Sequence, residues 1–157
     1  MPVYNHYYPD SKNQINTPES AAQLARYGPV VPVTIGVTAR HATILQKLNL
    51  AVPTAISGSA LIDTGSTFCA VDGDVVKSLG IPQFGTASVY TPSGTAQLPT
   101  YPASLSFPGT TLPNITFADF MGSPLKAQGI IALIGRNVLM DFVLVYNGPG
   151  GFVSLTY

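Results

Sequence analysis

Asp63 is the residue whose surroundings point most directly to chemistry. It lies in the stretch ALIDTGSTFCAV (60–71), where Asp-Thr-Gly-Ser separates two apolar runs. Taken alone, Asp-Thr-Gly-Ser is ordinary turn chemistry, because Asp and Ser side chains bond the local backbone and Gly accepts a positive φ. The apolar flanks argue against a simple surface turn. They place the carboxylate at the floor of an apolar site, where an uncompensated charge is costly.

A second carboxylate beside Asp63 would make such a site chemically useful. Two like charges about 3 Å apart share one proton over a wide acidic range. The ionised member can take a proton from a water held between them while the protonated member polarises a carbonyl, which is general acid–base hydrolysis of an amide. The chain has no second Asp-Thr/Ser-Gly, since the acids in 71–74, 118–120 and 140–142 lack that form. We therefore expect the partner to be Asp63 of a second copy.

This pattern resembles the retropepsin-like (retroviral-type) aspartic proteases, which are homodimers contributing one Asp per subunit, and the whole looks like a bacterial-type member. A second match is ALIGRNVL (132–139), similar to the family's pair of apolar residues followed by Gly-Arg-Asn. The order along the chain also agrees: catalytic turn, hairpin, Gly-Arg-Asn segment, C-terminal strand. The resemblance covers roughly 30–157 and implies a homodimeric aspartic endopeptidase that acts on an extended peptide or protein.

The resemblance assigns a role to each part of the site. Asp63 is the catalytic residue, and the turn that braces the dyad is formed by Thr64, Gly65 and Ser66. The hairpin at 86–107 is the flap that closes over substrate, with binding residues Tyr90, Thr91, Pro92, Ser93 and Gly94. The segment that packs behind the turn is Ile134, Gly135, Arg136 and Asn137. Neither a metal nor a cofactor is implied.

Two positions depart from the retroviral pattern. Thr67 stands where those enzymes usually have an Asp that pairs with the Arg. Arg136 therefore needs another acceptor: a backbone carbonyl, Asp72, or an acid of the partner subunit. Ser66 stands where they have Ala, and its hydroxyl can donate to the carboxylate and favour its ionised form. That donation predicts a more acidic pH optimum than the retroviral enzymes show.

Other readings fit some of the same residues. A catalytically silent retropepsin-like dimer could act as a peptide-binding or scaffolding module, although such a module does not need a desolvated carboxylate pair. In a proprotein, residues 1–28 would occupy the cleft until removed. We expect Cys69 to be a buried structural thiol rather than a reactive one. His6 and His41 have no ligand-spaced neighbours, so a metal site is not expected.

Composition bounds the class of protein. The 157 residues fit one domain, and 9% of them are charged and 46% hydrophobic, with a formal net charge of zero. That balance gives no basic patch for nucleic acid. No apolar run approaches the roughly 20 residues of a membrane span, and no export signal is seen. We expect a cytoplasmic protein whose weakly charged surface is partly covered by a second subunit.

The elements that must position these residues are mostly short strands. We expect strands at 30–37, 57–63, 68–72, 114–120 and 129–135, and a terminal hairpin made of 142–148 and 151–157. The prolines of 30–37 suggest an edge strand, and a tight turn at 64–66 joins 57–63 to 68–72. Short helices are expected after a Thr17 cap with Gly28 at the end, around 42–48, at 74–80 with Asp74 as cap, and over one or two turns within 136–142.

Short strands with Pro and Gly turns predict an all-β fold. The resemblance specifies a small closed β-barrel-like retropepsin (acid protease) fold with a flap hairpin and one or two short helices. Residues 1–28 would be an amino-terminal extension, either flexible or prosegment-like, and 29–157 the protease domain. We expect 151–157 to pair with its symmetry mate or with the other subunit's amino-terminal strand, which would bury an exposed edge.

Overall fold

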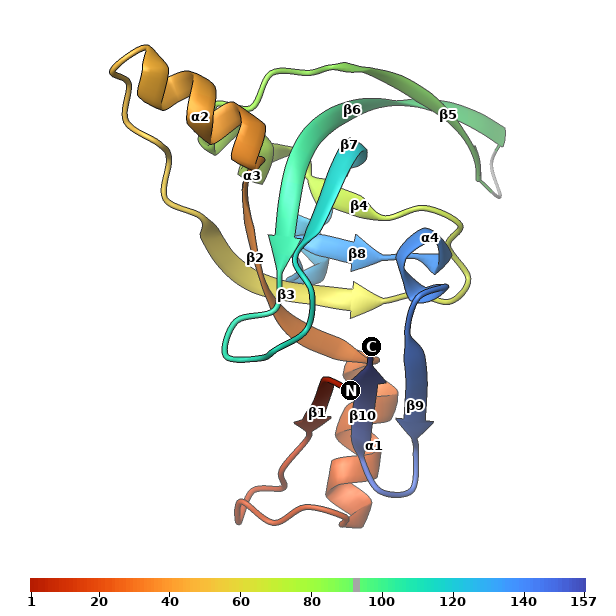
Figure 1. Cartoon of the computed structure of the whole chain (residues 1–157). Coiled ribbons are helices and arrows are strands. Elements are labelled where there is room, and N and C mark those ends of the chain that lie inside the picture. The colour runs from red at the N-terminus through yellow and green to blue at the C-terminus, as the bar shows by residue number, and fades with distance from the viewer. Residues whose placement is uncertain (92–93) are drawn as a thin grey trace.

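The fold is built on a curled seven-stranded sheet with a three-stranded sheet beside it (Figure 1). The structure is a computed structural model and describes residues 1–91 and 94–157. In the order in which they pair, the strands of the large sheet are β2 (Val30–Val37), β3 (Ile56–Ile62), β8 (Ala132–Ile134), β4 (Ala70–Asp72), β7 (Ile115–Ser123), β6 (Gly94–Ser106) and β5 (Gly85–Thr91). Because β2 also pairs with β6, six of these strands form a ring and β5 lies outside it.

The main hydrophobic core is shared by the strands of this ring. Val31, Val33 and Ile35 alternate along β2 and are fully buried, as a period of two residues requires of a strand with one face inward. Phe120 of β7 and Leu105 of β6 are also fully buried in the same core. This alternation fixes the register of the strands, since a slip of one residue would turn the apolar set outward.

The small sheet joins the two ends of the chain. Its strands are β1 (Val3–Tyr7), β10 (Phe152–Thr156) and β9 (Val143–Asn147), in the order β1-β10-β9. The terminal hairpin of β9 and β10 is confirmed, whereas β1 was not anticipated. The expectation that 151–157 pairs with a second subunit is wrong, because β1 and β9 of the same chain occupy both sides of β10.

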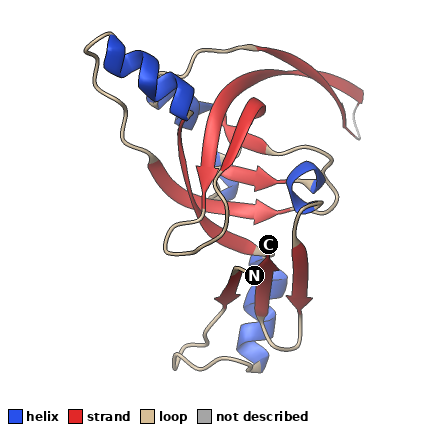
Figure 2. Ribbon diagram, in the orientation of Figure 1, coloured by secondary structure: helices blue, strands red, loops and turns tan. Residues whose placement is uncertain are grey.

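The described residues form four α-helices, at the places where local signals predicted them, and one 3-10 helix, whereas the resemblance implied only one or two helices (Figure 2). The helices observed are α1 (Pro18–Tyr27), α2 (Ala39–Lys47), α3 (Gly73–Ser78), α4 (Arg136–Leu139) and the 3-10 helix η1 (Lys126–Gln128). The limits of α1 are confirmed: Thr17 caps it and Gly28 ends it at φ 73°. The cap of α3 is Asp72 and not Asp74, because the Asp72 side chain accepts the Asp74 amide. No helix in the described ranges is long and apolar enough to cross a membrane.

Two expectations about neighbouring strands are corrected. Strand β2 is not an edge strand: it pairs with β3 over 30–35 and with β6 over 34–37, and Pro32 lies in the part that pairs with β3 alone. Strands β3 and β4 are not joined as neighbours by the turn at 64–66. Strand β8 lies between them, parallel to β3 and antiparallel to β4, so the turn spans the width of an intervening strand.

The expected hairpin is present as β5 and β6, which pair from Gly85 with Thr100 to Thr91 with Gly94. Pro92 and Ser93, expected at its tip, lie outside the described residues. Strand β6 pairs with β5 over 94–100 and with β7 over 100–105, so the hairpin leaves the ring near Thr100. Figure 1 shows it curving over the side of the molecule that holds the turn after β3.

Candidate active site

The turn that carries Asp63 is closed by its own backbone and side chain. The Gly65 amide donates to Asp63 Oδ1 at 2.8 Å, and the Ser66 amide donates to the Asp63 carbonyl at 3.2 Å. The Asp63 amide donates to the carbonyl of Ile134 at 2.9 Å, which continues the β3–β8 pairing one residue beyond the strands. The carboxylate is half-buried, while Thr64 and Gly65 are exposed. Hydrogen bonds to the backbone therefore fix the turn at Asp63, while the next two residues remain open to solvent.

Gly135 allows the segment 134–137 to contact the turn at 63–68. A Cβ built on Gly135 would lie 2.5 Å from the carbonyl oxygen of Phe68 and 2.6 Å from its carbonyl carbon. These are backbone atoms, so no side chain could move aside to make room. Next in the chain, the amides of Arg136 and Asn137 donate to the carbonyls of Ser66 and Thr67 at 2.9 and 3.0 Å. The segment 134–137 thus lies directly against the segment 63–68.

Arg136 finds its acceptors within the turn. Its Nη1 donates to the carbonyl oxygens of Thr64 at 2.7 Å and Gly65 at 2.9 Å, and its Nη2 donates to Thr67 Oγ1 at 2.8 Å. Of the three acceptors considered from the sequence, the backbone carbonyl is the one observed. Asp72 is not an acceptor for Arg136, because its carboxylate binds the amides of Asp74, Leu125 and Lys126.

Cys69 links the same two segments from the buried side. Its Sγ accepts the Gly135 amide at 3.2 Å and donates to Asn137 Oδ1 at 3.1 Å. The side chain is 2% exposed, which confirms a buried thiol. Burial raises the pKa of the thiol to about 11, and the Gly135 hydrogen bond offsets only part of that rise. The sequence suggested burial but gave no sign of the link to Asn137.

Ser66 does not act on the carboxylate as expected. Its hydroxyl donates to the carbonyl of Phe68 at 2.8 Å, two residues further along the chain. Short polar side chains often make such local bonds in turns, and here the backbone acceptor takes the one proton the hydroxyl can give. The Ser66 hydroxyl therefore gives no structural basis for the more acidic pH optimum that was expected from it.

A cavity of about 280 Å³ separates the turn from the hairpin. Its lining residues come from the turn, from β5 and from β7: Gly65, Ser66, Thr67, Phe68, Ser88, Val89, Tyr90 and Met121. Tyr90 was expected here, and its side chain is 92% exposed at the rim. Ser88, Val89 and Met121 were not singled out from the sequence, since nothing in their local pattern distinguishes them from other strand residues.

Within the described residues, the site holds one acidic side chain and no cluster of three His, Cys, Asp or Glu that could hold a metal. No hydrogen bond or ion pair in that part of the chain joins Asp63 to a second acid. The Asp63 carboxylate accepts one backbone amide, and the cavity is lined by the turn residues that begin two positions after it. In chemical terms this is a carboxylate that a second acid could still approach.

Comparison with known proteins gives a likeness in structure but none in sequence. No protein-family model matches the sequence, and no curated protein matches it. Among solved structures, the fold is similar to that of a retropepsin-like aspartic protease from Rickettsia conorii, with a TM-score of 0.42 and 14% sequence identity, over 99% of this chain and 92% of that chain. The case for an activity therefore rests on the residues of this chain.

Proposed function

We propose that the chain is an aspartic endopeptidase that works as a homodimer, with Asp63 of each copy forming one carboxylate dyad. The observation that carries the proposal is the cavity between the Asp63 turn and strand β5 of the hairpin. A rigid turn on one side and a hairpin on the other are the two walls that an extended peptide needs. The carboxylate stands at the end of the turn wall.

The dyad would hydrolyse an amide without a covalent intermediate. One Asp63 carboxylate takes a proton from a water while the protonated Asp63 of the other copy donates its proton to the scissile carbonyl oxygen. Water oxygen bonds to the carbonyl carbon and a tetrahedral diol results. The Asp63 that took the water proton then gives it to the amide nitrogen while the other Asp63 takes a proton from a diol hydroxyl; the C–N bond breaks, and the products are a carboxylic acid and an amine. The proton count of the dyad is restored.

The openness of the turn supports a second copy. Thr64 and Gly65 are exposed, and Arg136 holds their carbonyl oxygens from the side rather than covering them. A buried dyad requires that this open face be covered, because the shared proton depends on exclusion of bulk water. A second copy brings both the cover and the missing carboxylate.

The same side of the molecule carries exposed apolar side chains. Phe68 follows the turn and is 50% exposed, Met140 follows α4 and is 80% exposed, and Val143 and Val145 of β9 are 62% and 47% exposed. Strand β9 is also an edge of the small sheet. Apolar residues gathered around an unfinished site are a normal feature of a subunit interface.

Substrate would bind as an added strand. Strand β5 is the last strand of the large sheet, so its outer edge has no neighbour among the described strands. An extended peptide can use such an edge for backbone hydrogen bonds, while side-chain pockets provide selectivity. The cavity beside Ser88, Val89 and Tyr90 lies against this strand.

The decisive experiment compares wild type with Asp63→Asn on a peptide library between pH 3 and 7. Wild type is expected to cleave, and Asp63→Asn to lose at least about 10³-fold in rate, because an amide cannot take the water proton. Asp119→Asn is the matched control, since Asp119 is an exposed acid on β7. Equal cleavage by wild type and Asp63→Asn would contradict the dyad. Peptide binding by both proteins without cleavage by either would favour the silent binding module.

Sedimentation tests the dimer separately. Wild type is expected to be a dimer at micromolar concentration. Val145→Lys is expected to be more monomeric and correspondingly less active, because a charge would be buried in the interface. Ile44→Lys is the matched control, as Ile44 is 48% exposed on α2, a helix without buried residues. A fully active monomer would contradict the half-site.

A further inference from the structure

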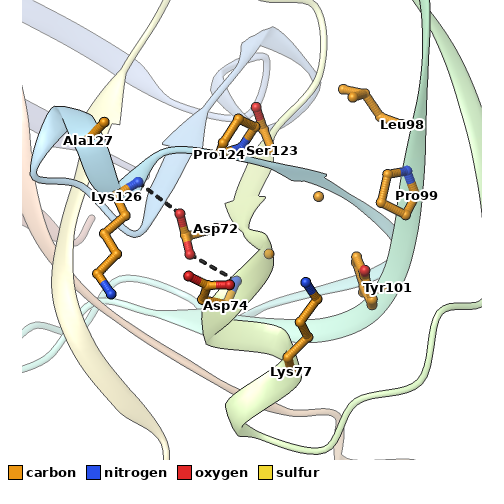
Figure 3. Close-up of a pocket in the computed structure, with 12 residues that line it drawn as sticks. Asp72, Asp74, Lys77, Leu98, Pro99, Tyr101, Ser123, Pro124, Lys126 and Ala127 are labelled. Carbon is orange, nitrogen blue, oxygen red and sulfur yellow. Dashed lines mark hydrogen bonds between the residues drawn. The ribbon is translucent and has the colours of Figure 1, made fainter.

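A second cavity, of about 360 Å³, lies at the base of the hairpin and apart from the Asp63 turn (Figure 3). Helix α3, strand β6 and the connection from β7 to η1 enclose it, and it is lined by Asp72, Gly73, Asp74, Lys77, Leu98, Pro99, Tyr101, Gly122, Ser123, Pro124, Lys126 and Ala127. We propose that this cavity binds a small organic anion, with one anionic group held by Lys77 and Tyr101 and an apolar body against β6.

Tyr101 supplies a neutral donor. Its side chain is 6% exposed, and its hydroxyl makes no hydrogen bond to any described residue. Gly122 leaves room for the ring, because a Cβ at Gly122 would lie 2.6 Å from Tyr101 Cε2, next to the carbon that bears the hydroxyl. A buried tyrosine usually finds a partner for its hydroxyl. The described residues contain no fully buried side-chain oxygen without a partner, so the Tyr101 hydroxyl reaches the solvent of the cavity, where a ligand oxygen could replace water as its partner.

Lys77 supplies the positive charge. It is exposed on α3 and forms no ion pair with a described residue, and Figure 3 shows its ammonium group directed into the cavity on the side of Tyr101. An ammonium group and a phenol hydroxyl are both donors, which together suit a carboxylate or another small anionic group.

The nearby acids do not cancel this preference. Asp72 is buried and its two oxygens accept three backbone amides, so its charge is already compensated. Asp74 and Lys126 line both this cavity and a smaller hollow beside Asp72, and as one acid and one base they add no net charge to the cavity. Figure 3 shows both of them away from Tyr101. Lys77 is the charged side chain of the lining that Figure 3 shows on the side of Tyr101.

The remaining lining selects for an apolar body. Leu98 and Pro99 of β6 and Pro124 of the connection present apolar surface to the cavity. These β6 residues immediately precede Thr100, where the hairpin leaves the ring. A ligand in this cavity would touch α3 and the hairpin base at once. The binding itself does not depend on whether the chain is a protease.

Titration with benzoate, followed by the amide resonances of the full chain, tests the proposal. Benzoate carries one carboxylate on a flat apolar ring, and benzamide is its neutral counterpart. We expect saturable benzoate shifts confined to residues 72–77, 98–101 and 122–126, with a Kd of about 1–10 mM for so small a ligand. Benzamide is expected to bind at least about tenfold more weakly.

Variants separate this site from general surface effects. Lys77→Met is expected to weaken benzoate binding about tenfold, and Tyr101→Phe several-fold, with unchanged unfolding transitions because neither group bonds the rest of the chain. Lys47→Met, at the exposed end of α2, is expected to leave binding unchanged. Absence of saturable shifts, equal binding of benzamide, or unchanged binding by Lys77→Met would each overturn the proposal.

Discussion

Arg136 donates from Nη2 to Thr67 Oγ1 at 2.8 Å, so its partner at position 67 is a neutral hydroxyl. The same guanidinium holds the carbonyls of Thr64 and Gly65. The planar guanidinium therefore fixes the conformation of the turn through hydrogen bonds to three acceptors, none of which carries a charge. The geometry of the turn depends on these hydrogen bonds rather than on an ion pair.

We predict that Arg136→Lys destabilises the fold by about 1–2 kcal/mol, because a lysine cannot reach three acceptors in one plane. Urea unfolding measures the loss. Arg40→Lys, on the exposed first turn of α2, is the control and is expected to change stability by less than about 0.5 kcal/mol. Since the contacts are not ionic, the loss should persist in high salt; a loss that disappears with salt would contradict this account.

Gly135→Ala is expected to destabilise the protein by about 1–3 kcal/mol, because its Cβ would collide with the Phe68 backbone. Gly73→Ala is the opposite case. Nothing lies within 4 Å of a Cβ at Gly73, which begins α3, so alanine there should be neutral or stabilising by up to about 1 kcal/mol. Thermal unfolding of the two variants, side by side, gives the comparison. Equal stability would mean that 134–137 and 63–68 are not in close contact.

Asp72→Asn is expected to cost about 2–3 kcal/mol, because the amide group would turn a donor toward backbone amides that need an acceptor. Burial tends to raise the pKa of Asp72, but hydrogen bonds from the amides of Lys126, Asp74, Leu125 and Val75 outweigh it and the pKa is lowered. A lowered pKa in the folded state means that this stabilisation is present above the ordinary value of 3.8 and is lost as the pH falls below it.

Unfolding measured from pH 6 down to pH 2 would show the Asp72 contribution as a difference between wild type and Asp72→Asn that shrinks with acid. Asp119→Asn should follow the wild-type profile, since Asp119 is exposed. A constant gap between wild type and Asp72→Asn across the whole range would show that Asp72 acts without its charge.

We predict that the protein loses stability in alkali as the buried Cys69 thiol ionises. Its pKa in the folded chain is raised from 9.0 to about 11, so the folded state favours the thiol. The stabilisation is full below pH 9 and is lost as the pH rises through about 11. Tyr4 and Tyr8, whose pKa values burial also raises, act in the same direction. Cys69→Ala should therefore remove only part of the loss of stability between pH 9 and 11, and the part that remains is due to the two tyrosines.

A thiol reagent provides an independent measurement. In the folded chain, Cys69 is expected to react slowly with the reagent at pH 8, because its side chain is buried and remains a thiol at that pH. The same chain in denaturant should react fully. Rapid reaction of the folded protein would show that the segment around Cys69 opens easily.

Local signals in the sequence were sufficient for the elements that depend on local chemistry. The Thr17 cap, the Pro at the start and the Gly at the end defined α1, and the turn residues defined the β5–β6 and β9–β10 hairpins. Elements that depend on distant partners were missed or misplaced. Strand β8 has three residues, and its insertion between β3 and β4 is decided by pairing across about 70 positions of sequence.

The same distinction applies to the candidate site. The two motifs around Asp63 and Gly135 could be found by residue type and spacing, but their mutual contacts could not. The Ser66 hydroxyl donates to the nearer Phe68 carbonyl, a choice between two local acceptors that spacing does not decide. Asp72 was considered as a partner for Arg136, whereas it caps α3 and holds the amides of Leu125 and Lys126.

The pairing of β1 with β10 has a consequence for how the chain reaches its fold. Val3 lies opposite Thr156, and the Tyr157 amide donates to the Pro2 carbonyl at 3.1 Å. Contacts between residues so far apart in the sequence close a long loop and form slowly. During synthesis, β1 cannot pair until β10 has been made. Until then its strand edge is unprotected, and the newly made chain is most exposed to wrong pairing during this interval.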